Sequence, residues 1–145
     1  MYDRILLPTD GSDNAQLATD RAMDTATRHD AVLHVLYVEE KTRDDPVQTG
    51  PEEKLAKEKQ TGRGVLGTVE DQAEPAGVET TTTLARGVPR TTIEDYTDEH
   101  DIDLVVIGST GASDVSDKLL GTVSKYVVNE APADVLVVRP DELLS

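Results

Sequence analysis

The sequence predicts an α/β fold, a single domain built on a doubly wound, parallel five-stranded sheet. Two observations indicate this class: short runs rich in Val, Leu and Ile recur along the chain, and segments with a helical pattern lie between them. A third is size, because 145 residues are close to the commonest length of one domain and can bury one core. We therefore expect one domain over residues 1–145.

Five runs are expected to be strands. Three of them are almost continuously apolar, which is typical of a parallel strand covered by helices on both faces. Residues 78–84, VETTTTL, are rich in Thr and polar at alternate positions, which favours the edge of a sheet. The other four runs are residues 4–8, 31–38, 103–107 and 134–139.

The first helix is expected from Ser12 to about Arg28. Ser12 is a residue type that caps helix N-termini, and small apolar side chains recur on one helix face after it. These side chains are Ala15, Ala18, Ala22 and Ala26.

Two further helices are expected later in the chain. One begins at Pro89, a favoured first position, and runs to about His100 with Ile93 and Tyr96 at helical spacing. The other covers residues 120–130 and ends before Pro132. Its inward-facing side chains are expected to be Val123, Val127 and Val128.

The segment 51–75 is expected to form a helix that is frayed or bent in its middle, after a polar loop at residues 39–50. Gly62, Gly64 and Gly67 each weaken a helix by about 1 kcal/mol relative to Ala. These glycines also spell GxGxxG, but a charged helical run precedes them where a dinucleotide site needs a strand. Thr68 follows where a phosphate-binding loop needs Lys, so no such loop is expected.

The alternation of strands and helices predicts the sheet order 3-2-1-4-5, a Rossmann-like arrangement, because crossovers between parallel strands are right-handed. Ligands of such sheets bind beyond the carboxyl ends of the strands, where the strand order reverses. That point lies between the first and fourth strands. It brings residues 8–12 next to residues 108–111.

The charge balance excludes two classes of partner. The chain carries 29 acidic residues against 14 Lys and Arg, a formal net charge of −15. Phosphate backbones and anionic lipids would be repelled, and we expect no direct binding of nucleic acid or membranes. Acidic residues spread along the whole chain are typical of surfaces that stay solvated in a salt-rich cytoplasm, which favours a halophilic, haloarchaeal source over an ordinary acidic protein.

Other classes are excluded by residues that the chain lacks or scatters. There is no Cys, so disulfides and thiolate zinc sites are ruled out. His29, His34 and His100 have no metal-ligand spacing on one helix face. The N-terminus lacks the pattern of a signal peptide and no stretch is long enough to span a membrane, so we expect a cytosolic protein.

A glycine pattern follows the fourth strand. Gly108, Ser109, Thr110 and Gly111 are followed by nine residues and then by Gly121 and Thr122 at the start of a helix. Glycine lets the backbone approach a phosphate closely, and a helix N-terminus offers free N–H groups, so the pattern suits an anion. The alternative is a glycine-rich turn with Thr122 as a helix cap.

The first strand ends in Pro8, Thr9 and Asp10 at the same edge of the sheet. A carboxylate there can accept hydrogen bonds from ribose hydroxyls. The alternative is that Asp10 and Ser12 only cap the following helix, and both roles are compatible.

These residues resemble the universal stress protein family, in its UspA-like, ATP-binding branch. The family's nucleotide motif is GxxG followed by nine residues and then G[ST]. Gly108, Gly111, Gly121 and Thr122 match it. Further similar motifs cover the chain from end to end. They are ILxPTDxS at 5–12, LHV at 33–35, GxP at 87–89, DLVVIG at 103–108 and APxxVLVVRP at 131–140.

The resemblance implies an adenine nucleotide alpha hydrolase-like fold and a ligand, ATP or another adenine nucleotide, often with Mg²⁺ or Mn²⁺. It implies that Asp10 faces the adenosine, that the backbone of Val35 pairs with adenine, and that Gly108 and Gly111 surround ribose and phosphate. The helix start that would hold the phosphates is Gly121, Thr122 and Val123.

The nine-residue spacer departs from the family. Related proteins often carry basic residues there, whereas this chain has Asp114, Ser116 and Asp117 with Lys118 as its basic residue, and Thr110 between the first two glycines. Carboxylates near a triphosphate lower its affinity by repulsion, an effect that salt screens.

A stress-response binding module that uses adenine nucleotides as a regulatory ligand is the favoured function. No catalytic residue is assigned, because Asp10 is the one carboxylate expected to face the ligand; a hydrolase would therefore be slow. A phosphoacceptor receiver domain is not favoured, since its Asp and Lys are absent from the third and fifth strand ends. A nucleotide-free member of the family stays open, and mass spectrometry of ligand carried through purification would distinguish it.

The fifth strand is expected to mediate a homodimer. It lies at a sheet edge, and unpaired backbone groups at an apolar edge are normally protected in a monomer. Pairing across a two-fold axis would bury Val135, Leu136, Val137 and Val138. The family resemblance implies the same surface, and the alternative is that residues 141–145 cover the edge.

Overall fold

The computed structural model describes residues 1–40, 52–110 and 121–140, with side chains for all of these except 52–60. Its strands are β1 (Arg4–Pro8), β2 (Val32–Glu40), β3 (Thr80–Gly87), β4 (Leu104–Gly108) and β5 (Asp134–Val138). Its helices are α1 (Asp13–His29), α2 (Glu52–Ala76), α3 (Pro89–Glu99) and α4 (Thr122–Glu130).

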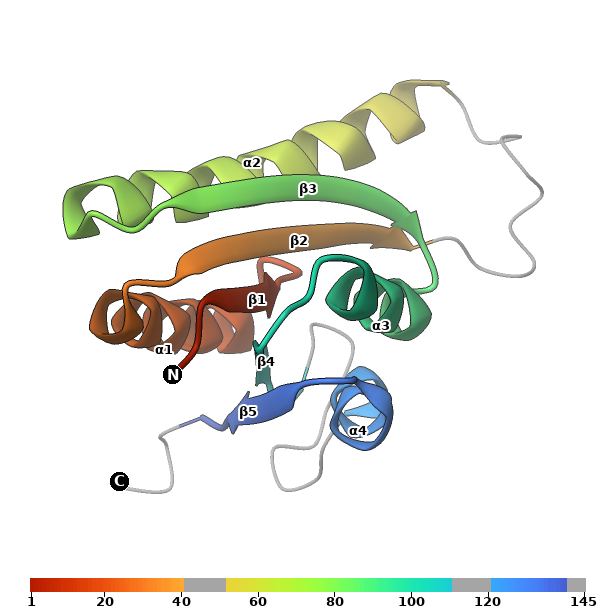
Figure 1. The fold of residues 1–145 in the computed structure, drawn as a ribbon. Helices are drawn as coiled ribbons and strands as arrows, with labels where there is room; N and C mark the ends of the chain where they lie inside the picture. Colours follow the sequence, from red (N-terminus) through yellow and green to blue (C-terminus); the bar gives the residue numbers. More distant parts are fainter. Residues whose placement is uncertain (41–51, 111–120, 141–145) are drawn as a thin grey trace.

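The five strands form one parallel sheet in the order β3-β2-β1-β4-β5 (Figure 1). The predicted fold class and strand order are therefore confirmed. The Thr-rich strand β3 lies at one edge of the sheet, as expected, and β5 lies at the other.

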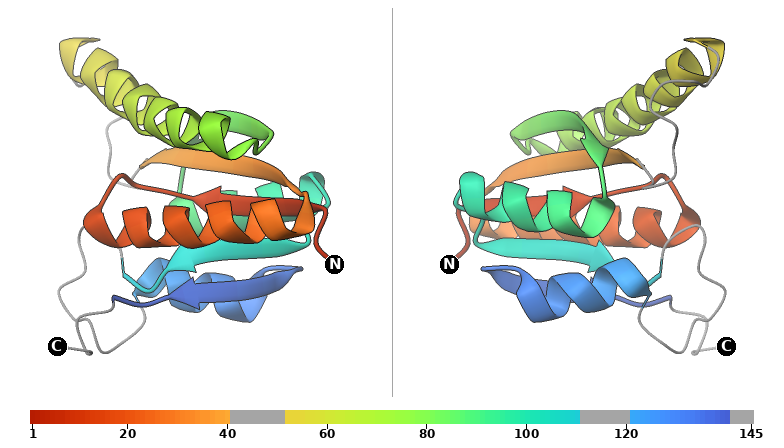
Figure 2. Two further views of the ribbon diagram at one scale, coloured as in Figure 1. Left: turned by 90° about the vertical axis from the view of Figure 1, so that its left-hand side faces the viewer. Right: turned by 90° about the vertical axis from the view of Figure 1, so that its right-hand side faces the viewer.

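Helices cover both faces of the sheet: α1 and α2 lie on one face, and α3 and α4 on the other (Figure 2). Successive side chains of a strand point to opposite faces, so each central strand contributes to two cores. The α1/α2 core contains Ile5, Leu7, Leu33, Val35 and Val106 with Ala18, Ala22 and Ala26 of α1. The α3/α4 core contains Leu6, Leu36, Val105 and Ile107 with Ile93, Tyr96 and Val127.

Helix α1 follows the sequence prediction closely. Ser12 is its N-cap, and the Ser12 side chain accepts a hydrogen bond from the N–H of Ala15 at 3.2 Å. All four predicted inward alanines are buried, with exposed fractions of 7% or less.

Helix α2 is one continuous helix of 25 residues that runs through all three glycines. A Cβ atom at Gly62 would lie 2.6 Å from Leu84 Cδ1 and 2.8 Å from Tyr37 Cδ1. The missing side chain therefore lets α2 lie directly on β2 and β3. Packing on the sheet outweighs the low helix propensity of glycine here.

One boundary and one inward face are corrected by the structure. Strand β2 runs to Glu40, because β3 pairs with it as far as Glu40 and Gly87, so the predicted loop at 39–50 loses its first two residues; the rest lies outside the described residues. Val128 is 43% exposed, which contradicts its predicted inward position. Val123 and Val127 share a helix face, whereas Val128 lies about 100° further round.

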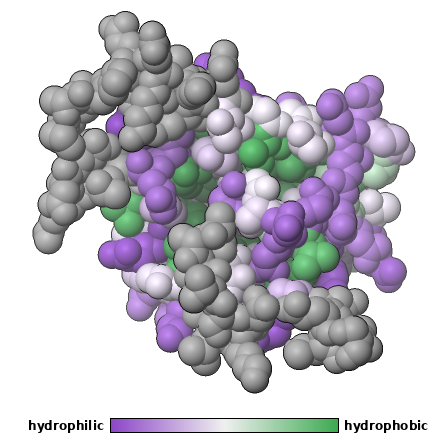
Figure 3. All heavy atoms as spheres, turned by 180° about the vertical axis from the view of Figure 1, so that it is seen from behind, coloured by the Kyte–Doolittle hydropathy of each residue, from purple (hydrophilic) through white to green (hydrophobic). Residues whose placement is uncertain are grey.

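The described surface is mostly polar. In Figure 3 hydrophilic residues surround a few separate hydrophobic patches on the face seen from behind Figure 1. Within the described residues, no helix combines the length and the apolar character that crossing a bilayer requires.

Candidate functional site

The carboxyl ends of β1 and β4 lie side by side, with Ile5 in register with Leu104 and Leu6 with Val105. From these ends the chain leads to α1 on one face of the sheet and toward α4 on the other (Figure 2). The strand order reverses here, which is where open parallel sheets bind their ligands.

A tight turn follows β1. Thr9 extends the β1–β2 pairing through its N–H, which donates to the carbonyl of Leu36 at 2.9 Å, and its hydroxyl accepts from the N–H of Gly11 at 3.2 Å. Gly11 has a φ of +78°, a conformation that suits glycine. Asp10 is exposed, and its Oδ1 accepts from the N–H of Ser12 at 2.9 Å. The turn therefore holds the Asp10 carboxylate at the rim while Ser12 caps α1.

The end of β4 is packed tightly against the start of α1. A Cβ atom at Gly108 would lie 2.8 Å from Asn14 Nδ2 and 3.2 Å from the Asn14 carbonyl oxygen. Asn14 Nδ2 donates to the carbonyl of Thr110 at 2.8 Å. Only glycine fits at position 108 without displacing Asn14.

The end of β4 is also tied to α4. The backbone N–H of Ser109 donates to the carbonyl of Val138 at 2.9 Å, and the backbone carbonyl of Ser109 accepts from the N–H of Gly121 at 2.7 Å. The Ser124 hydroxyl donates to the carbonyl of Gly108 at 2.6 Å. These bonds fix the N-terminus of α4 beside the strand end.

Two buried oxygen atoms at this point, Ser109 Oγ and Asn14 Oδ1, have no hydrogen-bond partner among the described residues. Ser109 is fully buried. An unmade hydrogen bond of this kind costs about 1–3 kcal/mol, and buried polar atoms are normally paired. Both atoms belong to residues next to the end of β4, Ser109 in the sequence and Asn14 in space, so this rim suits a polar ligand.

The N-terminus of α4 has no side-chain cap. Gly121 is its N-cap, with φ −66° and ψ 166°, and makes no capping hydrogen bond through a side chain. Thr122 is the first helical residue and is exposed, so the alternative in which Thr122 caps the helix is wrong. The first N–H groups of a helix have no partner within it, so this end can accept an anion.

Two further predicted site residues, Val35 and Val123, differ in their position relative to the rim. Val35 is fully buried in the middle of β2, paired with Leu7 on one side and Thr82 on the other, so the structure does not bring it to the rim. The side chain of Val123 packs against the α3/α4 core, which leaves its backbone for a ligand. Gly111 lies outside the described residues, as does the acidic spacer.

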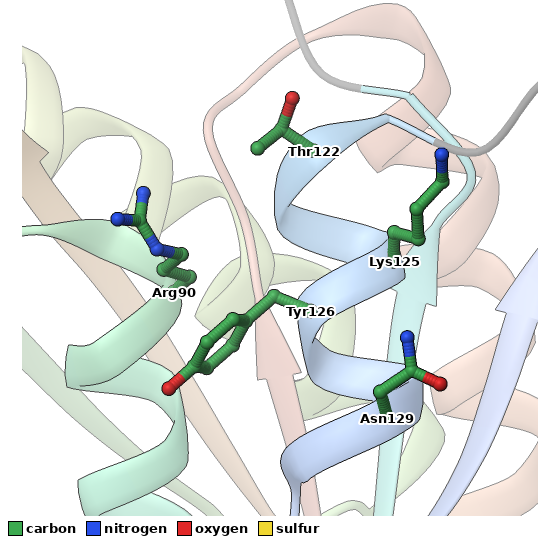
Figure 4. A pocket seen from close by; sticks show the side chains of 5 residues that line it. All are labelled: Arg90, Thr122, Lys125, Tyr126 and Asn129. Carbon is green, nitrogen blue, oxygen red and sulfur yellow. The ribbon is translucent and has the colours of Figure 1, made fainter.

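The sequence prediction missed a basic groove between α3 and α4. It has a volume of about 380 Å³ and is lined by Arg90, Thr122, Lys125, Tyr126 and Asn129 (Figure 4). Arg90 follows the GxP motif and Lys125 lies one helical turn after Thr122, but nothing in the sequence indicates that these two segments meet.

Tyr126 connects the two helices in this groove. Its hydroxyl donates to Glu94 Oε1 at 2.6 Å, and the guanidinium of Arg90 lies 5.8 Å from the centre of its ring, within the range of a cation–π contact. The hydrogen bond to Glu94 raises the pKa of Tyr126, and burial adds to the effect.

Described side chains form no group of three or more His, Cys, Asp or Glu that could hold a metal ion.

The sequence model of the universal stress protein family matches residues 1–139. The chain belongs to the universal stress protein family. It is 33% identical over 141 residues to universal stress protein MJ0531 of Methanocaldococcus jannaschii, covering 96% of this chain and 83% of that protein.

Solved universal stress proteins share the fold. One is UspA from Lactobacillus plantarum, with a TM-score of 0.84 and 34% identity over 95% of this chain and 98% of that one. Another is a universal stress protein solved in complex with cAMP, with a TM-score of 0.75 and 28% identity over 95% and 97% of the two chains.

Proposed function

We propose that this universal stress protein binds an adenine nucleotide, with ATP as the expected ligand, between the ends of β1 and β4, and that occupancy regulates its interactions in the stress response. The observation that carries the proposal is the uncapped N-terminus of α4 beside Ser109 and Asn14, whose buried oxygens have no partner in the described chain. The relative solved with cAMP supports an adenine nucleotide as the ligand class.

Each predicted contact has a physical basis. Asp10, exposed at the rim next to Pro8 and Thr9, can accept from ribose hydroxyls. Gly108 lets the end of β4 pack directly against Asn14. The N–H groups of Thr122 and Val123, at the start of α4, would face phosphate oxygens. A bound Mg²⁺ or Mn²⁺ would neutralise phosphate charge and would take its ligands largely from the phosphates, as Mg²⁺ does with few protein carboxylates.

Substitution of Gly121 tests the site. Gly121→Val should abolish ATP binding, because a branched side chain blocks the approach to the α4 N-terminus, whereas the φ of −66° is one that valine adopts. Isothermal titration calorimetry in molar KCl, with and without Mg²⁺, measures the affinity. The control is Gly64→Val on α2, where a Cβ atom meets no atom within 4 Å. Equal ATP affinity in Gly121→Val and wild type would place the site elsewhere.

Two alternative functions have their own outcomes. Absence of any adenine nucleotide binding by the wild type, with no ligand in the purified protein by mass spectrometry, would favour a nucleotide-free interaction protein. Release of phosphate from bound ATP in single turnover would favour a slow hydrolase. We also propose that the protein is cytoplasmic, that it is adapted to high salt, and that it forms a homodimer through β5.

A further inference from the structure

Two cations line the α3/α4 groove without forming an ion pair in the described part of the chain. They are Arg90 and Lys125, and the recorded contact of Arg90 is with the Tyr126 ring. The nearby carboxylate of Glu94 accepts the Tyr126 hydroxyl hydrogen bond. In a chain of net charge −15, a groove whose two cations have no ion-pair partner among the described residues is suited to an anion supplied from outside.

The groove is continuous with the proposed phosphate site. Thr122 is the first residue of α4 and also lines the groove. Figure 4 shows the Thr122 hydroxyl and the Lys125 amino group pointing toward the end of the molecule where β4 ends, with Arg90 across from them on α3. Helix α3 begins at the same end of the sheet, and its N-cap, Val88, makes no side-chain hydrogen bond. Arg90 is the second residue of α3 and Thr122 is the first residue of α4, so the groove lies next to the positive ends of both helices.

We propose that Arg90 and Lys125 bind the outer phosphate groups of the nucleotide, so that the site prefers nucleoside triphosphates and diphosphates over monophosphates. The inference rests on the proposed function. A first phosphate at the N-terminus of α4 leaves further phosphates to extend past Thr122, where the cations lie. A groove of about 380 Å³ is within the size range of small-molecule sites, which starts near about 300 Å³.

The test compares the affinities of ATP, ADP and AMP by calorimetry in wild type, Arg90→Gln, Lys125→Gln and the double variant. Each single substitution should lower the affinity for ATP by about fivefold, as expected for a partly solvated charge contact, and the affinity for AMP by less than about twofold. Arg90→Lys should restore most of the ATP affinity, because it restores the charge. The matched control is Arg21→Gln, which makes the same change in net charge from α1, on the opposite face of the sheet.

Three outcomes would overturn the inference. One outcome is that the substitutions weaken ATP binding and AMP binding equally. Another is that they weaken ATP binding no more than Arg21→Gln does. Both apply to variants whose circular dichroism matches the wild type. The third is tripolyphosphate that binds in the presence of saturating ATP and requires Arg90 and Lys125, because the groove would then be an anion site separate from the phosphates of the bound nucleotide. If these results appear while Gly121→Val still abolishes binding, only the inference fails; if the wild type binds no nucleotide, the proposed function fails as well.

Discussion

Two glycines of α2, Gly62 and Gly64, have opposite effects on the stability of the protein. At Gly62 a side chain would overlap Leu84 and Tyr37, whereas at Gly64 a Cβ atom meets nothing within 4 Å. Gly62 is buried and Gly64 is exposed. The first glycine is therefore a packing requirement, and the second only weakens the helix.

Alanine substitutions should separate these two roles. Gly64→Ala should raise the free energy of unfolding by about 0.5–1 kcal/mol, the gain in helix propensity. Gly62→Ala should lower it by about 1 kcal/mol, because overpacking costs about 1–3 kcal/mol and exceeds that gain. Denaturant unfolding in molar KCl measures both. Stabilisation by Gly62→Ala would show that α2 does not rest on β2 and β3 as described.

Helix α3 is attached to β2 through a polar cluster within the α3/α4 core. The Nδ1 of His34, on β2, lies 2.7 Å from the Tyr96 hydroxyl oxygen, on α3, and the Tyr96 ring stacks on His100 with centroids 3.7 Å apart. His34 is only 9% exposed. Burial lowers the pKa of His34 below its ordinary value, and the positive charges of His100 and Arg4 lower it further.

This cluster should make stability depend on pH. The pKa of His34 is lower in the folded chain, so the unfolded chain binds the proton first as pH falls. The stabilisation is complete above the unfolded value of about 6.5 and is lost as pH falls from there toward the folded value, by at most about 1.4 kcal/mol per pH unit. Between pH 7 and 5 the free energy of unfolding should therefore fall less in His34→Gln than in wild type.

The control for this experiment is His29→Gln, a partly exposed histidine at the end of α1. His29→Gln makes the same substitution outside the cluster, so a change in the pH profile that is equal in both variants would not be specific to His34. Parallel pH profiles for wild type and His34→Gln would show that His34 does not contribute to the acid response.

The whole molecule has two sheet edges, and the backbone groups at each can be assigned. The N–H of Asp134 donates to the backbone carbonyl of Asp103 at 3.2 Å, and the carbonyl of Val138 accepts from the N–H of Ser109 at 2.9 Å. The peptide groups of Asp134 and Val138 therefore face β4. The peptide groups of a parallel strand alternate in direction, so those of Val135 and Val137 point to the free edge of β5.

Proline substitution at this edge tests the proposed dimer. Val137→Pro removes one outward N–H and keeps the bonds to β4, so it should convert a dimer into a monomer in sedimentation at molar KCl. The control is Thr82→Pro on β3. The bond from Leu33 N–H to Glu79 at 2.9 Å shows that the Thr82 N–H points away from β2, to the other edge. A wild type that is monomeric at micromolar concentration, or a dimeric Val137→Pro, would contradict pairing through β5.

Local patterns determined most elements. β1 has its predicted bounds, α3 begins at Pro89, and α1 has its predicted cap, because an apolar period or a capping residue depends on neighbours in the sequence. The predicted end of β2 was wrong, because the strand continues as far as β3 pairs beside it, and no local pattern in the sequence indicates that length.

The sequence by itself determined the order of strands and helices, the position of the switch point and the candidate residues at the ends of β1 and β4, since element order and handedness together leave few topologies. Only the tertiary structure decided that Val35 lies inside the sheet, that Gly62 is required for packing, and that Arg90 and Lys125 line one groove. Each of these facts depends on contacts between segments far apart in the chain. Such contacts follow from how the helices pack on the sheet, and the propensities of single residues do not encode that packing.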